Sequence, residues 1–323
     1  MIIAFIDELR TEGHAVESIC RVLREQDCQI AARTYRDWTR SDRPVATRTI
    51  SDAIVTNVVR DLAWRVDIHG VRRMTPEGLY GRRKMTALVR RSNPGASPGA
   101  VDRAMKSLDL QGIRRSKGIR TTIRSKDGNR AGDLLDRNFT AIAPNRTWVM
   151  DFTYVRTWAG FVYVAFVLDV FAQEIVAWLA DPSKPVELVK VPLRMALWQR
   201  KREGHPVVPG ELIGHADAGS QYTSITFTDH LTDQGIRPSI GSVADAYDNA
   251  LMECVIGLFK TECIRTTIFH AGPYRAISDV EYATAGWVDW YNNQRLHSSL
   301  GMKSPIEFEQ AHYATLNREP QPA

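Results

Sequence analysis

The sequence contains little cysteine, with four such residues among 323. Cys20, Cys28, Cys254 and Cys263 form no CxxC pair, and no histidine stands at zinc-finger spacing from them. This pattern excludes a zinc-finger framework and favours reduced, structural thiols. Because adjacent helical residues diverge by roughly 100°, we expect Cys254 to face the core if its neighbour Glu253 faces a site.

The sequence also lacks long hydrophobic runs. Hydrophobic residues make up 44% of it, as in a globular protein, but no run approaches the roughly 18 to 20 apolar residues of a membrane span. The opening MIIAFIDELR meets an acidic residue too soon for a secretory signal peptide. We therefore expect a cytoplasmic protein, long enough for two or three domains.

The second half of the chain lacks a net positive charge, whereas the first half has a large one. Residues 1–145 hold 27 Lys and Arg against 17 Asp and Glu, a net +10, whereas residues 146–323 hold 15 against 20, a net −5. The basic half is expected to hold nucleic acid. The acidic half fits a site that gathers cations, although surface charge alone would also account for it.

Three acidic residues stand on different predicted elements. Asp151 interrupts the β-rich TWVMDFTYV, and Asp217 follows a short apolar run. Glu253 lies one turn into a helix predicted over residues 247–262, and 35 residues separate it from Asp217. Lys260 follows seven residues later, so a regular helix would present Glu253 and Lys260 on one face.

These residue types suit metal-dependent phosphoryl transfer. Hard divalent cations such as Mg²⁺ prefer oxygen ligands, and two ions bridged by carboxylates can activate an attacking oxygen and stabilise a leaving one. Three carboxylates converging from two strands and a helix would serve that chemistry. The alternative is that Asp151, Asp217 and Glu253 are separate, solvated surface acids.

The amino-terminal half is predicted to be helical. Helices over residues 1–12, 16–26 and 31–40 suit either a small helix-turn-helix unit or a dimerising or packing element. After a joint at Pro44, a helix is predicted over about residues 51–66, followed by a loop. We expect residues 1–45 to form the first domain.

Residues 46–112 are predicted to form a second helical domain. Two helices flank a turn near residue 94, and Ser97 caps the second helix with Pro98 at its first position. The pattern favours a DNA-binding helix-turn-helix, with a small helical domain bearing solvated basic faces as the alternative. The basic residues expected to contact DNA here are Arg82, Arg83, Arg103 and Lys106.

Residues 113–145 read as a basic linker whose charge would follow a phosphate backbone. Its residues assigned to DNA are Arg114, Arg115 and Lys117. Residues 146–275 then predict strands and helices in the order βββαβαβα, an α/β fold with a mixed five-stranded sheet flanked by helices. The strands are expected over residues 147–157, 160–172, 174–181, 211–215 and 236–240, and the helices over 185–202, 225–234 and 247–262.

Other residues of this half are given structural roles. Asp169 and Asp181 are predicted to be turn residues. A helix over residues 278–295 is expected to pack on the core by its aromatic side chains, with DNA contact by Arg295 and His297 as the alternative. Residues 276–323 form the last predicted segment, a helix and a tail.

Jointly, these motifs resemble a known family. The two aspartates and the glutamate at this spacing, Lys260, the GSQYTS after Asp217 and the YDNA before Glu253 resemble the DDE transposases of the retroviral-integrase superfamily. The nearest likeness is to OrfB-type transposases of the insertion-sequence-three family. YGRRKM and the closing WYNNQRLHSSLGMKSPIEF are also similar to that family, so the resemblance covers about residues 45–310.

The resemblance implies a ribonuclease-H-like catalytic core that cleaves DNA at insertion-sequence ends and transfers the 3′-hydroxyl to target DNA. It implies that Asp151, Asp217 and Glu253 are catalytic and hold two Mg²⁺ ions, which Mn²⁺ can replace. Lys260 would hold a phosphate near the scissile position. The residues expected to line the DNA-facing rim are Ser220, Gln221, Tyr222 and Asn249, with local hydrogen bonding to backbone groups as the alternative for each.

The implied partners are terminal inverted repeats and target DNA, with homo-oligomers on DNA in a bacterial cytoplasm or nucleoid. An upstream OrfA-type portion is either absent or replaced by residues 1–40. Ala216 and Ala218 depart from the family's Ser or Thr and basic residue, so a contact is expected to be missing there.

Two rival functions remain open at this point. One is an inactive DNA-binding remnant or regulator of transposition, and the other is a ribonuclease-H-like nuclease that cuts without joining. The three acids with Lys260 argue against the first, and the basic half argues against the second.

Overall fold

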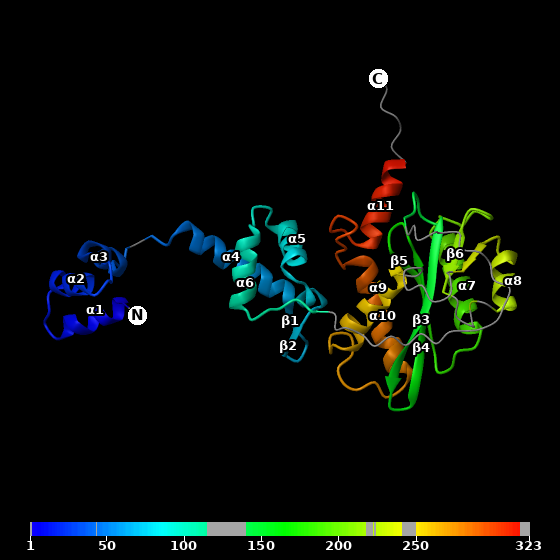
Figure 1. Ribbon diagram of the computed structural model, residues 1–323, viewed down its shortest axis with the longest axis horizontal. Helices are drawn as coiled ribbons and strands as arrows, with labels where there is room; N and C mark the ends of the chain where they lie inside the picture. Colours follow the sequence, from blue (N-terminus) through cyan, green and yellow to red (C-terminus); the bar gives the residue numbers. More distant parts are fainter. Residues whose placement is uncertain are drawn as a thin grey trace, which may run out of the picture. The chain divides into compact units, whose positions relative to one another are not determined.

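A computed structural model describes residues 2–42, 44–114, 140–217, 222, 224–240 and 250–316 of the chain (Figure 1). It divides into two compact units, Met1–Ile54 and Val55–Ala323, and each is described by itself. Among the described residues, no helix has the length and apolar character that crossing a bilayer requires.

The first unit holds the three predicted helices, α1 (Ile2–Thr11), α2 (Val16–Glu25) and α3 (Ala32–Thr39). They share a small core that includes Ile6, Ile19 and Tyr35. The Tyr35 hydroxyl donates to the Asp7 carboxylate and accepts from Arg10 Nη1 at 2.7 Å, so one buried ring ties α3 to α1. The prediction of three short helices is confirmed.

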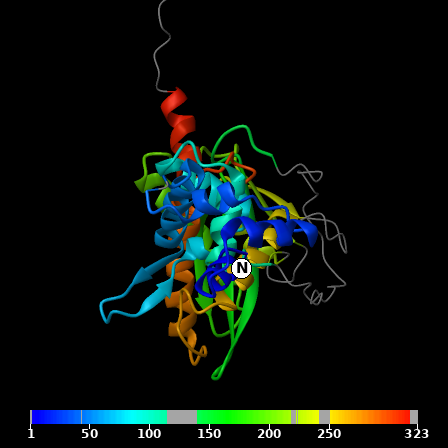
Figure 2. The ribbon, with the colours of Figure 1, turned by 90° about the vertical axis from the view of Figure 1, so that its left-hand side faces the viewer.

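Helix α4 (Thr47–Ala63) ends earlier than expected, and the predicted loop is a hairpin of β1 (Trp64–Val66) and β2 (Arg72–Met74). The Asp67 carboxylate accepts from the backbone N–H groups of His69 and Val71, each at 2.9 Å, and Gly70 adopts φ 76°. This side-chain-stabilised turn reverses the chain. The hairpin projects from the helices, as Figure 2 shows.

The two helices predicted within residues 79–112 are confirmed as α5 (Arg82–Ser92) and α6 (Pro98–Ser107). Ser97 Oγ accepts from the Ala100 N–H at 3.1 Å, the cap expected from the sequence. Met85 and Val89 of α5 pack with Val101 of α6 in the same apolar cluster. The arginines of both helices and Lys106 are left on the outer faces.

The carboxyl-terminal half is built on one mixed sheet, ordered β5-β4-β3-β6-β7. Strands β3, β4 and β5 form an antiparallel meander, whereas β6 and β7 run parallel to β3. This is the ribonuclease-H-like topology predicted from the sequence. The strands are β3 (Thr147–Thr157), β4 (Gly160–Asp169), β5 (Glu174–Asp181), β6 (Ile213–Ala216) and β7 (Arg237–Ile240).

Helices cover both faces of this sheet (Figure 1). Trp148 and Met150 of β3 point to one face, where α7 and α8 pack, and Val149 points to the other, where α9 and α10 pack. The alternation of side chains along a strand makes these two cores. The helices are α7 (Glu187–Arg202), α8 (Ile225–Asp233), α9 (Ala250–Leu258), α10 (Ile277–Asn293) and α11 (Pro305–Leu316).

A buried ionic cluster joins two strands of the sheet, β4 and β5, to helices α7 and α11. Arg200 of α7 is 1% exposed and forms ion pairs with Asp169 at 3.4 Å, Glu174 at 3.2 Å and Glu309 at 2.8 Å. Asp169 is the last residue of β4 and is fully buried, so its prediction as a turn residue is wrong, although its carboxylate accepts from the N–H of Phe171 in the turn that follows. One guanidinium therefore offsets three buried carboxylates.

The predicted packing role of the carboxyl-terminal helix is confirmed. Trp287 of α10 is buried and packs against Phe259 at 5.3 Å between ring centroids. Arg295 and His297 are buried as well, so the alternative that these two side chains touch DNA is wrong. Arg295 instead binds the buried Glu262 carboxylate through Nε at 2.8 Å and Nη2 at 2.6 Å.

Candidate active site

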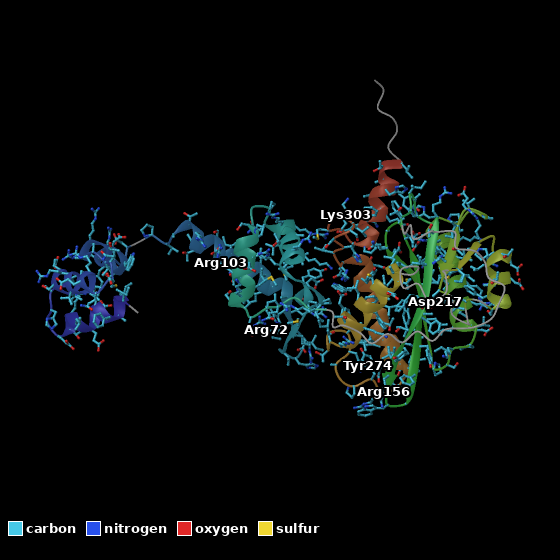
Figure 3. The ribbon with its side chains drawn as sticks, in the orientation of Figure 1. Arg72, Arg103, Arg156, Asp217, Tyr274 and Lys303 are labelled. Atoms are coloured by element: carbon cyan, nitrogen blue, oxygen red, sulfur yellow. The ribbon has the colours of Figure 1, made fainter. Side chains whose placement is uncertain are left out.

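The first two acids are brought together by strand register. Strand β3 pairs in parallel with β6 from Thr147↔Ile213 to Met150↔Ala216. Asp151 and Asp217 are the next residue on each strand, so their side chains leave the same edge on the same face. Figure 3 places Asp217 beside β3. The two aspartates, 66 residues apart in the chain, thus lie next to each other because strands β3 and β6 are neighbours in the sheet.

The third acid arrives on α9, which packs on β3. Burial raises the pKa of the Asp151 carboxyl well above its usual range, and the charges of Asp217 and then Glu253 raise it further. The Phe152 N–H, which donates to Asp151 Oδ1 at 2.7 Å, and the Lys260 ammonium lower that pKa. Three predicted site residues, Asp217, Glu253 and Lys260, therefore act on one carboxyl group.

These carboxylates do not form a closed chelating group as they stand. Over the described parts of the chain, no three His, Cys, Asp or Glu side chains lie close enough to hold one metal ion. That Asp151, Asp217 and Glu253 bind metal together stays a prediction.

Lys260 lies in an irregular part of its helix. Helix α9 ends at Leu258 and continues as a π-helical turn, Phe259–Ile264, so the regular helix predicted through residue 262 is wrong. Such turns widen the backbone ring and change which face a side chain occupies. Burial lowers the pKa of Lys260, and its Nζ lies 4.8 Å from the ring centroid of Tyr154.

The ion pair of Glu262 with Arg295 anchors this turn. Glu262 is two residues from Lys260, and both partners of the pair are buried. Two parallel charge-assisted hydrogen bonds fix the carboxylate and hence the backbone of the turn. This pair was not predicted, because its members are 33 residues apart and nothing next to Glu262 in the sequence indicates its partner.

The chain is similar in sequence to integrases and transposases. Two models described as "Integrase core domain" match residues 141–246 and 234–305. A transposase-type protein of insertion sequence element IS986/IS6110 from Mycobacterium tuberculosis is 44% identical over 241 residues, 75% of this chain and 85% of that protein. The transposase for insertion sequence element IS629 of Shigella sonnei is 42% identical, over 75% of this chain and 77% of that protein.

The transposase InsF for insertion sequence IS3A of Escherichia coli K12 is 28% identical over 96% of this chain and 99% of its own length. This chain belongs to the insertion-sequence-three family of transposases. It is thus a DNA transposase, a polynucleotidyl transferase of the retroviral-integrase superfamily, and the resemblance seen in the sequence is confirmed.

Tyr222 of the transposase lies in the core and not on the rim. Its side chain is 1% exposed and packs against Phe152 at 6.0 Å and Phe227 at 5.5 Å between centroids. Burial raises its pKa, and the charges of Asp151 and Asp217 raise it further. The prediction that its side chain faces DNA is wrong, because a tyrosine ring is apolar enough to fill the core under the acids.

One further expectation about a single residue is wrong. Cys254 is exposed, because the turn of α9 that buries Met252 and Val255 points its neighbours outward. Ala216 is 2% exposed within the apolar core of one sheet face, and the missing DNA contact expected at this position stays a prediction.

The basic residues predicted to bind DNA are exposed where the structure describes them. Arg82 and Arg83 lie on α5, Arg103 and Lys106 on α6, and Arg114 follows α6. Lys106 Nζ lies 3.1 Å from Asp102 on the helix surface, a pair weak enough to yield to a phosphate. The remaining predicted residues, which are Arg115, Lys117, Ala218, Ser220, Gln221 and Asn249, lie outside the described residues.

Proposed function

We propose that this transposase cuts at insertion-sequence ends and joins the freed 3′-hydroxyl to target DNA, with Asp151, Asp217 and Glu253 as its catalytic acids. The observation that carries the proposal is that carboxylates from a strand, a strand end and a helix act on one another at one sheet edge. Solvated acids scattered over a surface would be screened from each other and would not do so.

The donor set fits hard divalent cations. All three predicted ligands are carboxylates, and the charges of Asp217 and Glu253 reach the Asp151 carboxyl, whose pKa is raised mainly by burial. We propose that Asp151, Asp217 and Glu253 hold two Mg²⁺ ions, which Mn²⁺ can replace. When bound, the ions supply activation of the attacking oxygen and stabilisation of the leaving one.

Lys260 is proposed to hold a DNA phosphate beside these acids. Its ammonium is half-buried, within electrostatic reach of Asp151, and steadied by the Tyr154 ring. Because water screens a half-buried cation less than an exposed one, its attraction for a phosphate is strengthened. The π-helical turn and the Glu262–Arg295 pair behind it hold Lys260 in that place.

Metal removal tests the proposed chemistry. With labelled end-sequence DNA, we expect the transposase to give joined products in Mg²⁺, none in EDTA, and products again when excess Mg²⁺ is restored. Gel-shift binding in EDTA serves as the control for DNA contact. Joining that persists in EDTA would refute the proposed metal site. Cleavage without joining would favour a nuclease. DNA binding without products in Mg²⁺ would favour an inactive remnant.

Residues 46–112 are proposed as the DNA-binding domain and residues 113–145 as a basic linker to the core. We expect Arg103→Ala with Lys106→Ala to weaken end binding and to reduce the slope of log affinity against log salt by roughly one to two, since about 0.9 counterion is released per phosphate contact. The control is Arg194→Ala, an exposed arginine on α7. An unchanged slope would show that α6 does not contact DNA.

We further propose that the transposase acts as a homo-oligomer on DNA that engages both terminal inverted repeats and the target. Whether residues 1–40 replace an OrfA-type portion stays a prediction, and so does action on the nucleoid of a bacterial cytoplasm. Co-purification of the two ends in one complex of defined mass tests the oligomer.

A further inference from the structure

Large aromatic side chains are exposed along one hairpin of the catalytic half. Trp158 is 72% exposed, Phe161 51% and Tyr154 39%, and all three belong to the β3–β4 hairpin. Arg156 stands between them and pairs in register with Phe161. Because directly paired residues and alternate residues of a strand share a face, Tyr154, Arg156 and Phe161 lie on one face. We call these four residues the hairpin strip.

The hairpin strip is held in place. The rings of Tyr154 and Phe161 meet edge to face with centroids 5.3 Å apart. At the tip, the Trp158 N–H donates to the carbonyl of Tyr274 and the Ala159 N–H to that of Arg275, each at 3.0 Å. Figure 3 shows Arg156 and Tyr274 near each other at this end of the core. The exposed rings are thus fixed to the segment that precedes α10.

Cations accompany the rings. Lys260 Nζ lies 4.8 Å from the Tyr154 centroid, and the Arg275 guanidinium lies 5.4 Å from that of Trp158. Arg156, which is exposed, adds a third positive charge. Aromatic faces interleaved with cations are the chemistry that binds single-stranded nucleic acid, since bases stack on the rings and phosphates meet the charges.

The strip also leads away from the catalytic acids. Tyr154 and Trp158 are three and seven residues along the chain from Asp151, so at about 3.3 Å per residue their backbones lie up to roughly 10 and 23 Å from that of Asp151. Tyr154 and Arg156 lie on the opposite face of β3 from the Asp151 side chain, because side chains alternate along a strand. Lys260 connects the two, because it acts on Asp151 and contacts Tyr154. A few nucleotides next to the scissile position would cover this length.

We propose that the hairpin strip binds unpaired nucleotides of the DNA end, with bases on Tyr154, Phe161 and Trp158 and phosphates on Arg156, Lys260 and Arg275. The inference rests on the proposed function and specifies the form of its substrate. A duplex hides the faces of its bases, so only nucleotides that have left the helix can stack in this way.

The test compares binding to a blunt duplex and to the same duplex with its last base pairs mismatched, by fluorescence anisotropy in EDTA so that no chemistry occurs. We expect the parent to prefer the mismatched end. Trp158→Ala is expected to lose on the order of tenfold in affinity for that DNA and to leave blunt-duplex binding unchanged, since a base stacked on an aromatic ring contributes about that factor.

The matched control is Trp198→Ala on α7. Trp198 is 58% exposed and carries Arg202 at 5.3 Å, the same pairing of ring and guanidinium on another surface. It is expected to bind both DNAs as the parent does, and thermal unfolding checks that each variant folds.

Three outcomes would overturn the inference: Trp158→Ala binding like the parent, losing equally on both DNAs, or changing self-association without DNA. Strand transfer by the parent is scored separately. A parent that makes no products yet shows the Trp158-dependent preference would refute the proposed function and leave the strip standing.

Discussion

Asp217→Asn and Glu253→Gln are each expected to abolish strand joining and leave DNA binding intact. Each change keeps the shape of the side chain but removes the negative charge that would hold a divalent cation. Loss of one preorganised electrostatic group from an active site lowers the rate by about 100- to 1,000-fold, and losing a metal ligand is expected to cost at least the upper figure.

Two measurements test the expected loss of strand joining and of metal binding. Joined products are counted on labelled end-sequence DNA, with Asp233→Asn and Glu281→Gln, which alter exposed acids on α8 and α10, as controls. Thermal unfolding gives a second readout, because an ion that binds only the folded protein raises its stability. Mg²⁺ should raise the unfolding temperature of the parent and of both controls more than that of either site variant. Joining by Asp217→Asn or Glu253→Gln at the parent's rate would contradict the assignment.

Arg200→Met is expected to cost about 3 to 5 kcal/mol of unfolding free energy, the usual cost of removing one partner from a buried ion pair. The change leaves Asp169, Glu174 and Glu309 buried without their cation. Arg202→Met, two residues on and exposed, is the control and is expected to change stability by about 0.5 kcal/mol or less. Urea denaturation followed by tryptophan fluorescence measures both.

The cost of Arg200→Met should depend on pH. Burial raises the pKa of the Asp169 and Glu174 carboxyls, and Arg200 opposes that rise. A carboxyl with a higher pKa in the folded than in the unfolded state takes up a proton on folding, so stability falls as pH rises from about 4 toward the folded pKa. Without Arg200 that fall is steeper, and the loss is expected to be larger at pH 8 than at pH 5. An equal loss at both values would show that the carboxylates are compensated elsewhere.

The elements of the catalytic core were largely predictable from the sequence. The strands predicted over residues 147–157 and 174–181 are present in the structure, and Ser97 with Pro98 predicted the start of α6. These signals are local, because side-chain periodicity and capping depend on neighbours a few residues away. The family, too, was evident from the spacing of three acids and one lysine.

The supporting contacts were not predictable in the same way. The hairpin after α4 required the turn around Asp67, and the π-helical turn at Lys260 breaks the regular period on which the helix prediction relied. A tyrosine side chain has a polar hydroxyl and an apolar ring, so it occurs both at protein surfaces and in cores. Tyr222 is buried because its ring packs against other aromatic side chains, which the sequence does not reveal.

The sequence by itself determined the succession of strands and helices, the uneven charge and the identity of the candidate acids. Tertiary structure decided which of those side chains meet: Asp151 beside Asp217 by strand register, Glu262 against Arg295, and Arg200 among three carboxylates from as far as 109 residues away. The reason is that periodicity is a property of neighbouring residues, whereas the partner of a buried charge is set by how distant elements pack.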